Sequence, residues 1–228
     1  MGTIGLSRTN RLFWLGRYLE RVYTTLKATR AMFDAETDGA EADYKYYCRR
    51  MGIACRYENT AAFIRSYYFD AENADSVAAS LAHAYDNAIV LRETLSSDTL
   101  AYVQMAVTAM ELAAKSSGPA VELQWVLDDI MAFRGSCEEN IEEEINRNII
   151  KSGASLERVD IFLRLGYPQE QCLKEVRHLA SRLKKAQLAV NENNMQFLLN
   201  SLAGSPSAAC AGAYSGGRRA ACKYLIDG

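Results

Sequence analysis

The apolar residues of this chain recur at helical spacing over long intervals that no proline interrupts. Only three prolines occur in 228 residues, at positions 119, 168 and 206. One apolar stripe, with steps of three and four, comprises Leu12, Leu15, Leu19, Val22 and Leu26. Alternating β-branched runs of the kind that form strands are missing. The sequence therefore predicts an all-α protein, a helical bundle with long helices.

Turn signals divide the chain into about seven expected helices. The clearest boundary is Ser116–Pro119, which combines stop and restart signals, and Gly52 is a candidate break in a Tyr-rich helix. The expected helices span residues 7–34, 44–69, 76–95, 98–115, 119–133, 136–165 and 169–202. Beyond residue 202 the composition shifts to Ala, Gly and Ser. We therefore expect a helical domain at 1–202 and a flexible tail at 203–228, with a short terminal helix near Arg218–Ile226.

The charge balance offers no global attraction to a polyanion. Twenty-six basic and 28 acidic residues give a net charge of −2, so no net field would attract nucleic acid or anionic lipid. Charges interrupt the apolar stretches before the ~20 residues of a membrane span, and Met1–Arg11 lacks the apolar core of a signal peptide. Six cysteines without a Cys-x-x-Cys pair indicate reduced thiols. We expect a cytoplasmic protein that binds neither nucleic acid nor membranes.

One motif occurs twice. Residues 16–22 read Gly-Arg-Tyr-Leu-Glu-Arg-Val, and residues 153–159 read Gly-Ala-Ser-Leu-Glu-Arg-Val, at a constant offset (157 − 20 = 137). Five of the seven positions are identical, and Leu26 matches Leu163 in the same register. This pattern favours duplication of a helical unit. We expect the two motif helices to pack together.

A pseudo-twofold arrangement would pair the charged residues of the motif reciprocally. Successive residues on a helix lie about 100° apart, so Glu20 and Arg21 need partners on other helices. Glu20 would meet Arg158, and Arg21 would meet Glu157. The glycine that opens each copy costs about 1 kcal/mol inside a helix. Close approach of the two backbones would explain both glycines.

The motif is compatible with a structural role and with a functional one. A buried Glu–Arg pair more often specifies packing than catalyses a reaction. Alternatively, the motif lines a polar site between the two helices, in which Arg17 and Arg21, with Tyr18 nearby, hold a carboxylate or phosphate. The second copy has Ala154 and Ser155 at the matching positions, so that site would be one-sided. The candidate residues under either interpretation are Arg17, Glu20, Arg21, Glu157 and Arg158.

Other chemical signals are weaker. Glu175 and His178 have the Glu-x-x-His spacing of di-iron bundles, but the other histidine, His83, follows Ser80 and leaves the set incomplete, so we expect no metal. No Gly-rich phosphate loop follows a strand, and no cofactor is expected. The acidic residues from Glu138 to Glu144 form the outer face of an amphipathic helix, in which Ile141, Ile145 and Ile149 have helical spacing. An aromatic and basic surface suited to a protein interface would comprise Tyr44, Tyr46, Tyr47, Tyr67, Tyr68, Arg49, Arg50, Arg56 and Arg65.

The motif and its surroundings resemble the alpha-E family of bacterial all-helical proteins. The resemblance begins with Leu6-Ser7-Arg8 and the run from Leu12 to Arg21. It continues with Asp75–Val77, Asn87-Ala88, Leu91–Ser97 and Leu156–Asp160, and so spans about residues 6 to 165. The chain departs from the family pattern at Tyr23, where a small or acidic residue is usual.

The resemblance implies an all-helical fold without an assigned activity. It also implies partners, because alpha-E proteins accompany ATP-grasp-type ligases and transglutaminase-like proteins and are sometimes fused to them. We therefore expect a non-catalytic partner or substrate-presenting subunit of a peptide-forming or peptide-modifying system, as a monomer or a homodimer. The alternative is an enzyme with a polar pocket between the two motif helices.

Overall fold

The computed structural model describes residues 5–39, 43–203, 220–222 and 225. Over these residues the chain forms nine long or medium α-helices, a short helical segment at 220–222 and no strand, which confirms the predicted all-α class. The helices are α1 (Leu6–Thr37), α2 (Tyr44–Met51), α3 (Thr60–Phe69), α4 (Val77–Val90), α5 (Ser97–Lys115), α6 (Ala120–Asn140), α7 (Glu144–Leu165), α8 (Gln169–Ala186) and α9 (Glu192–Ala203). None of these described helices combines the length and apolarity needed to cross a membrane.

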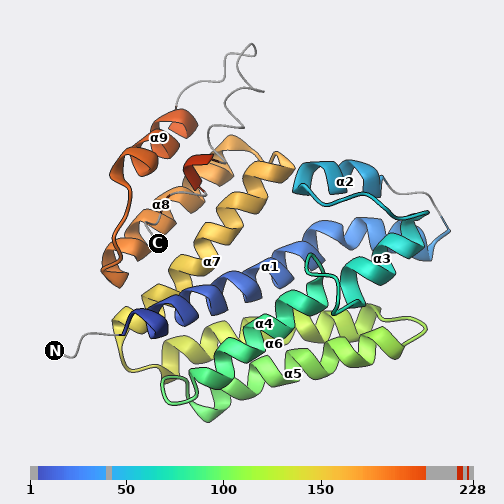
Figure 1. Ribbon diagram of the computed structural model, residues 1–228, viewed down its shortest axis with the longest axis horizontal. Coiled ribbons are helices and arrows are strands. Elements are labelled where there is room, and N and C mark those ends of the chain that lie inside the picture. Colours follow the sequence, from blue (N-terminus) through green and yellow to red (C-terminus); the bar gives the residue numbers. More distant parts are fainter. Residues whose placement is uncertain (1–4, 40–42, 204–219, 223–224, 226–228) are drawn as a thin grey trace.

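Helix α1 runs through the middle of the bundle (Figure 1). On one side it packs against α4 and α6, and α5 covers α4 and α6 from outside. On the other side α7 crosses α1, and α8 and then α9 continue the packing outward. The buried apolar residues form a larger core around α1–α6 and a smaller core around α7–α9, and Phe13 of α1 packs against both. Helix α1 thus contacts both cores, and α7 contributes buried residues to both.

The two motif glycines lie where α1 crosses α7. A Cβ atom at Gly16 would stand 2.0 Å from the carbonyl oxygen of Ile150, and one at Gly153 would stand 2.0 Å from that of Phe13. Phe13 and Ile150 are themselves separated by the repeat offset (150 − 13 = 137), so the two contacts are equivalent. The duplicated segments thus pack about a pseudo-twofold axis, backbone against backbone, as the glycines predicted.

Two of the expected long helices are interrupted. The Tyr-rich segment forms α2 and α3, because Gly52 adopts the left-handed conformation (φ 76°) and ends α2. The segment 169–202 forms α8 and α9, because Gln187, a residue without the usual preference for positive φ, adopts φ 55° after α8. The first break carries a glycine signal in the sequence, whereas the second does not. With these two breaks, the nine labelled helices of the described residues are roughly the number expected.

The expected helix at 136–165 is also wrong in its start. Helix α6 continues through Gly135 to Asn140, and the chain leaves the helical conformation at residues 141–143 before α7 begins. There the guanidinium of Arg147 donates hydrogen bonds to the carbonyl oxygens of Ile141 and Glu142. A basic side chain that satisfies the last carbonyls stabilises a helix end. The break depends on this return contact, which helical spacing does not reveal.

The described part of the C-terminal segment is docked. Ala221, Cys222 and Leu225 are buried in the smaller core. The backbone N–H of Asn191 donates to the carbonyl of Leu225 at 2.8 Å. The expected flexible linker lies, apart from residue 203, outside the described residues. The expected terminal helix is described only at 220–222 and at Leu225.

Alanine substitution tests the crossing directly. Gly16→Ala and Gly153→Ala each place a methyl group against a carbonyl of the facing helix, so each is expected to lower the free energy of unfolding by about 2 kcal/mol or more. Gly135→Ala is the matched control, because that glycine is also inside a helix but has open space at its Cβ position; it should leave stability unchanged or raise it by up to about 1 kcal/mol. Urea denaturation measures all three. Equal stability of Gly16→Ala and Gly135→Ala would contradict the close crossing.

Candidate functional site: the crossed Glu–Arg clusters of α1 and α7

The two motif glutamates are buried at the crossing, one turn beyond the glycines. Glu20 is 1% exposed and Glu157 is 2% exposed. A carboxylate out of water is costly unless its charge is paired and its oxygens accept hydrogen bonds. The glycines bring the helices close enough for each carboxylate to be reached from the opposite helix. The motif therefore combines a close contact with two buried negative charges.

Glu157 of α7 is held by two arginines of α1. The Nε of Arg21 donates to Oε1 at 2.6 Å. The Nε of Arg17 donates to Oε2 at 2.8 Å, and its Nη2 lies 2.7 Å from the same oxygen. Charge-assisted bonds of this length are about twice as strong as neutral ones. Both carboxylate oxygens are thus engaged.

Glu20 of α1 is held in the same way, but by different helices. Arg158 of α7 forms a bidentate pair with it: Nε donates to Oε1 at 2.7 Å and Nη2 donates to Oε2 at 2.9 Å. Arg134 of α6 adds a contact from Nη2 to Oε2 at 2.6 Å, and the hydroxyl of Thr24 donates to Oε1 at 2.8 Å. The structure therefore contains both expected pairs, Glu20 with Arg158 and Glu157 with Arg21, and a second guanidinium on each carboxylate.

The second guanidinium breaks the pseudo-symmetry. The position that matches Arg17 holds Ala154, which has no charge to offer Glu20. Arg134 supplies that charge from α6, stacked at 4.2 Å from the ring centroid of Tyr23. Sequence reasoning missed Arg134, since it lies just past the end of an expected helix. The signal that could have suggested such a residue is Ala154 itself, because a buried Glu20 with one guanidinium would be less well paired than Glu157.

A polar cleft opens beside the Glu20 cluster. It has a volume of about 500 Å³ and lies between α1, α7 and the first half of α8. Glu20 and Arg158 line it, whereas Arg17, Arg21 and Glu157 do not. The remaining lining residues are Tyr23, Thr24, Lys27, Phe162, Tyr167, Gln171, Lys174 and Glu175. This cleft lies beside the Glu20 cluster, whereas the polar site suggested by the sequence would lie at Arg17 and Arg21.

Comparison with known proteins gives one match. The sequence model of the Alpha-E family, a predicted alpha-helical domain with a conserved ER motif, matches residues 6–207. This chain belongs to the Alpha-E family. No curated protein and no solved structure matches it significantly. Adjacent Glu and Arg occur in that order at Glu20-Arg21 and Glu157-Arg158, the four residues that form the crossed pairs of this Alpha-E domain.

Electrostatics favour the ionised form of Glu157 in this Alpha-E domain. Burial is the largest effect and by itself raises the pKa of the Glu157 carboxyl. Attraction to Arg21 and Arg17, with the hydrogen bonds that both donate, more than offsets burial, so the pKa lies below its ordinary value. For Arg158, burial lowers the pKa, but the hydrogen bond and charge of Glu20 outweigh this and raise it. The clusters are therefore charged networks at neutral pH.

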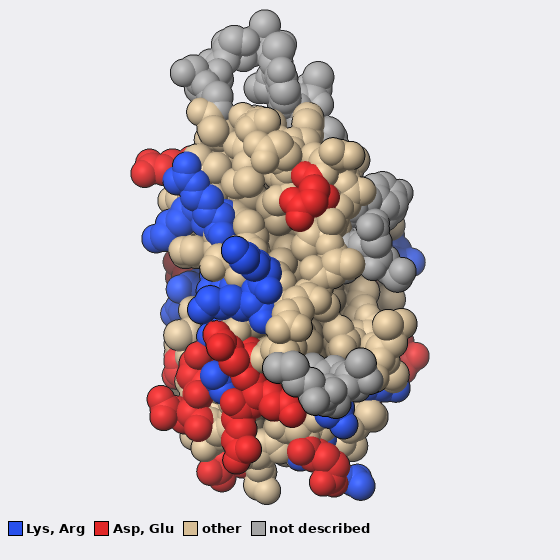
Figure 2. Space-filling view, turned by 90° about the vertical axis from the view of Figure 1, so that its left-hand side faces the viewer, with Lys and Arg blue, Asp and Glu red and all other residues tan. Residues whose placement is uncertain are grey.

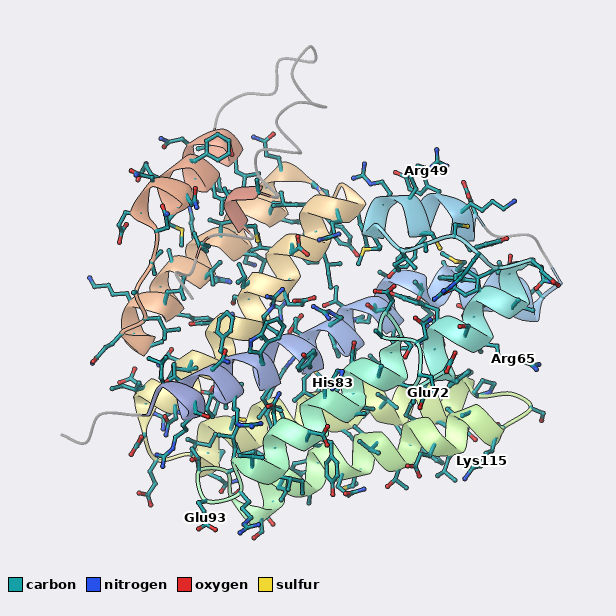
Figure 3. All side chains as sticks on the ribbon, in the orientation of Figure 1. Arg49, Arg65, Glu72, His83, Glu93 and Lys115 are labelled. Atoms are coloured by element: carbon teal, nitrogen blue, oxygen red, sulfur yellow. The ribbon has the colours of Figure 1, made fainter. Side chains whose placement is uncertain are left out.

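Aromatic rings cover the Arg17 and Arg21 side of the crossing. The Arg17 guanidinium lies 4.7 Å from the ring centroid of Trp14, and that of Arg21 lies 5.7 Å from Tyr18. Tyr18 also contacts His83 of α4, with ring centroids 5.3 Å apart, and Figure 3 shows His83 beside α1. These rings occupy the faces of the two guanidinium groups. Arg17 and Arg21, which the sequence suggested as an anion site with Tyr18, are thus engaged by Glu157 and by aromatic rings.

The expected aromatic and basic surface is wrong. Tyr44, Tyr47, Tyr67 and Tyr68 are buried in the larger core, and only Tyr46 is exposed, at 49%. The buried hydroxyl groups bond to one another or to neighbours, as Tyr47 does with Tyr67 at 3.3 Å. Burial raises the pKa of Tyr67 to about 12. Tyrosine is amphipathic, so its frequency alone does not separate a surface from a core.

The remaining candidate chemistry is structural. Glu175 pairs with Arg158 at 3.2 Å and lies 3.6 Å from Nδ1 of His178, and the described residues contain no group of three metal-ligand side chains. Burial raises the pKa of Cys48 and Cys137 to about 12, which disfavours the thiolate. The acidic residues around the α6–α7 connection are exposed. Figure 2 shows acidic side chains gathered on the lower half of the face that it draws.

Paired removal of arginines tests the Glu157 cluster. Arg17→Met or Arg21→Met alone leaves one guanidinium on the carboxylate, whereas the double variant leaves a buried charge without a cation. We expect the double variant to lose about 3–5 kcal/mol, more than the sum of the single losses. Adding Glu157→Met should recover most of that loss, because the uncompensated charge is removed. A triple variant no more stable than the double variant in urea denaturation would reject this account.

The pH dependence of stability tests the depressed pKa of Glu157. A group whose folded pKa is lowered contributes stability that is complete above its unfolded pKa, near the ordinary 4.5, and is lost as pH falls through the folded pKa. The free energy of unfolding should therefore decline below about pH 4.5, and less steeply in Glu157→Gln than in wild type. Parallel curves for the two proteins would show that Glu157 does not contribute to the acid-sensitive stability.

Proposed function

We propose that this Alpha-E protein is a non-catalytic partner or substrate-presenting subunit of a peptide-forming or peptide-modifying system. Its partners would be an ATP-grasp-type ligase and a transglutaminase-like protein. The observation that supports this proposal is the saturation of the motif: each buried carboxylate accepts bonds from two guanidinium groups. Such a carboxylate has its lone pairs occupied and is poorly placed to accept a proton from a substrate. The ER motif then serves to fix the crossing of α1 and α7.

Exposed apolar side chains on α5 and α6 support a partner surface. Met105 and Leu112 are two turns apart on α5 and are 50% and 48% exposed. Val121 and Trp125 are one turn apart on α6 and are 59% and 47% exposed. Large apolar and aromatic residues that stay exposed in pairs on one helix face are typical of docking surfaces. We therefore propose the α5–α6 hairpin as the protein-interaction surface, in place of the tyrosine-rich surface expected from the sequence.

The identity of the partners rests on the family. Alpha-E proteins accompany ATP-grasp-type ligases and transglutaminase-like proteins, and both classes act on peptide or amide bonds. A rigid helical bundle that binds such an enzyme would position a substrate or hold the enzyme in its active arrangement. The complex would form in the cytoplasm, where cysteines without a Cys-x-x-Cys pair remain reduced.

Affinity capture from the native host with matched variants tests the proposal. The wild-type protein is expected to retain an ATP-grasp-type or transglutaminase-like protein, and Trp125→Glu should lose most of it because a charge replaces an exposed apolar anchor. Phe197→Glu on α9 is the control, since Phe197 is also exposed (40%) but lies on the opposite layer of the bundle. Capture of neither enzyme class by the wild-type protein would contradict the proposal.

The cleft supports a second candidate function, an enzyme whose pocket lies between the motif helices. Of the five candidate residues only Glu20 and Arg158 line the cleft. A reaction there would use Glu175, Tyr23, Tyr167, Lys27 or Lys174 as the proton-transfer group, since Glu20 is fully paired. Turnover of a peptide substrate by the isolated chain, abolished by substitution of these residues, would favour the enzyme over the partner subunit.

A further inference from the structure

The cleft beside Glu20 carries a surplus of positive charge. Lys27, Lys174 and Arg158 line it, against Glu20 and Glu175. Three cationic groups thus face two carboxylates in the cleft, a surplus of one, and Arg134, which does not line the cleft, also binds Glu20. Within the described part of the chain, neither lysine has a carboxylate partner at ion-pair distance. Two lysines are thus available to a ligand while the arginines are occupied.

Arg182 of α8 lies close to the cleft without lining it. Its guanidinium donates to the hydroxyl of Ser155, at the position of the repeat that matches Tyr18. Burial, followed by repulsion from Arg158, lowers the pKa of Arg182. The charge that favours an anion in the cleft therefore comes from Lys27 and Lys174, which line it without a carboxylate partner among the described residues.

The walls of the cleft are aromatic and carry hydrogen-bonding groups. Phe162 and Tyr167 stack with centroids 4.2 Å apart and an interplanar angle of 4°. Tyr23 forms another wall, fixed by Arg134 over its ring. The amide of Gln171 and the tyrosine hydroxyls can donate and accept. Such walls suit a ligand with an apolar body and amide groups as well as negative charges.

The cleft is larger than a single small anion would fill. About 500 Å³ is in the range of ligand sites, roughly 300–1,000 Å³, and exceeds what one phosphate or carboxylate group fills. Lysines on flexible stems are point charges without the fixed fork of arginine, and they pair with carboxylates that are spaced along a chain. The ligand class that combines spaced carboxylates, amide groups and an apolar body is a short acidic peptide.

We infer that the cleft between α1, α7 and α8 binds a short acidic peptide, with Lys27 and Lys174 pairing with its carboxylates and Tyr23, Phe162 and Tyr167 contacting its body. Arg158 lines the cleft and, with Arg134, pairs with Glu20, so the guanidinium groups of both are already engaged by a carboxylate of the protein. The cleft would bind this peptide whether or not a partner enzyme docks on α5 and α6. An acidic peptide is also a chemically reasonable substrate or product for a peptide-forming system.

A tetraglutamate peptide is the probe, and isothermal titration of the full chain at low salt is the measurement. Wild-type protein should bind it saturably. Lys27→Gln with Lys174→Gln should weaken binding by about tenfold or more, because two charge-assisted contacts are lost. Lys27→Arg with Lys174→Arg should retain it. Both lysines are exposed, so an unchanged melting temperature verifies that the variants are folded.

Lys115→Gln with Lys184→Gln is the matched control, because it removes the same charge outside the cleft; Figure 3 shows Lys115 at the end of α5. This control should bind as wild type does. Three results would overturn the assignment: no saturable binding by wild type, an equal loss in the control, or binding of inorganic phosphate or ADP as tight as that of the peptide. Each is independent of affinity capture, so the peptide site and the partner proposal can fail separately.

Discussion

Everything else in this bundle depends on the crossing of α1 and α7, where two glycines permit backbone contact and two buried carboxylates require guanidinium partners. The glycines and the charges act together: a larger residue at position 16 or 153 would separate the helices, and separated helices could not pair Glu20 with Arg158 or Glu157 with Arg21. Helix α8 packs on α7 and α4 packs on α1, so the crossing of α1 and α7 is the most extensive contact between the two halves of the bundle. The ER motif of the Alpha-E family therefore has a physical role as a pair of reciprocal clamps.

Both Glu–Arg clusters contain one of the two reciprocal ion pairs, but they differ in the source of the second guanidinium and in the residues around it. This difference accounts for the cleft beside the Glu20 cluster. On the Glu157 side, Arg17 and Arg21 come from one helix and aromatic rings close over them. On the Glu20 side, Ala154 leaves a gap that Arg134 fills from α6, and the surface between α1, α7 and α8 remains open. A duplicated structural unit has thus diverged at one edge, where a ligand can be bound without disturbing the charge pairs that hold the fold.

The sequence predicted the parts of this structure that follow from periodicity and from the repeat. Helical spacing gave the all-α class, and the constant offset gave the two ion pairs and the glycine contact. Arg134 was beyond such reasoning because its role is set by the packing of α6, and the break before α7 depends on the return contact of Arg147. The buried tyrosines were misplaced because amphipathic residues fit a core or a surface equally well. Local patterns thus specify elements and their symmetric contacts, whereas long-range single contacts need the coordinates.

Native-state hydrogen exchange tests the central claim most directly. If the crossed ion pairs hold the two cores together, the amides of residues 12–22 and of residues 150–160 should exchange only through global unfolding. The free energy of opening should then be the same for both segments and should decrease with denaturant concentration at the same slope. Faster exchange is expected at the ends of α9, far from the crossing. Exchange of one motif segment at a much lower free energy than the other would show that α1 and α7 open separately. That result would contradict the crossing as the structural centre of this Alpha-E domain.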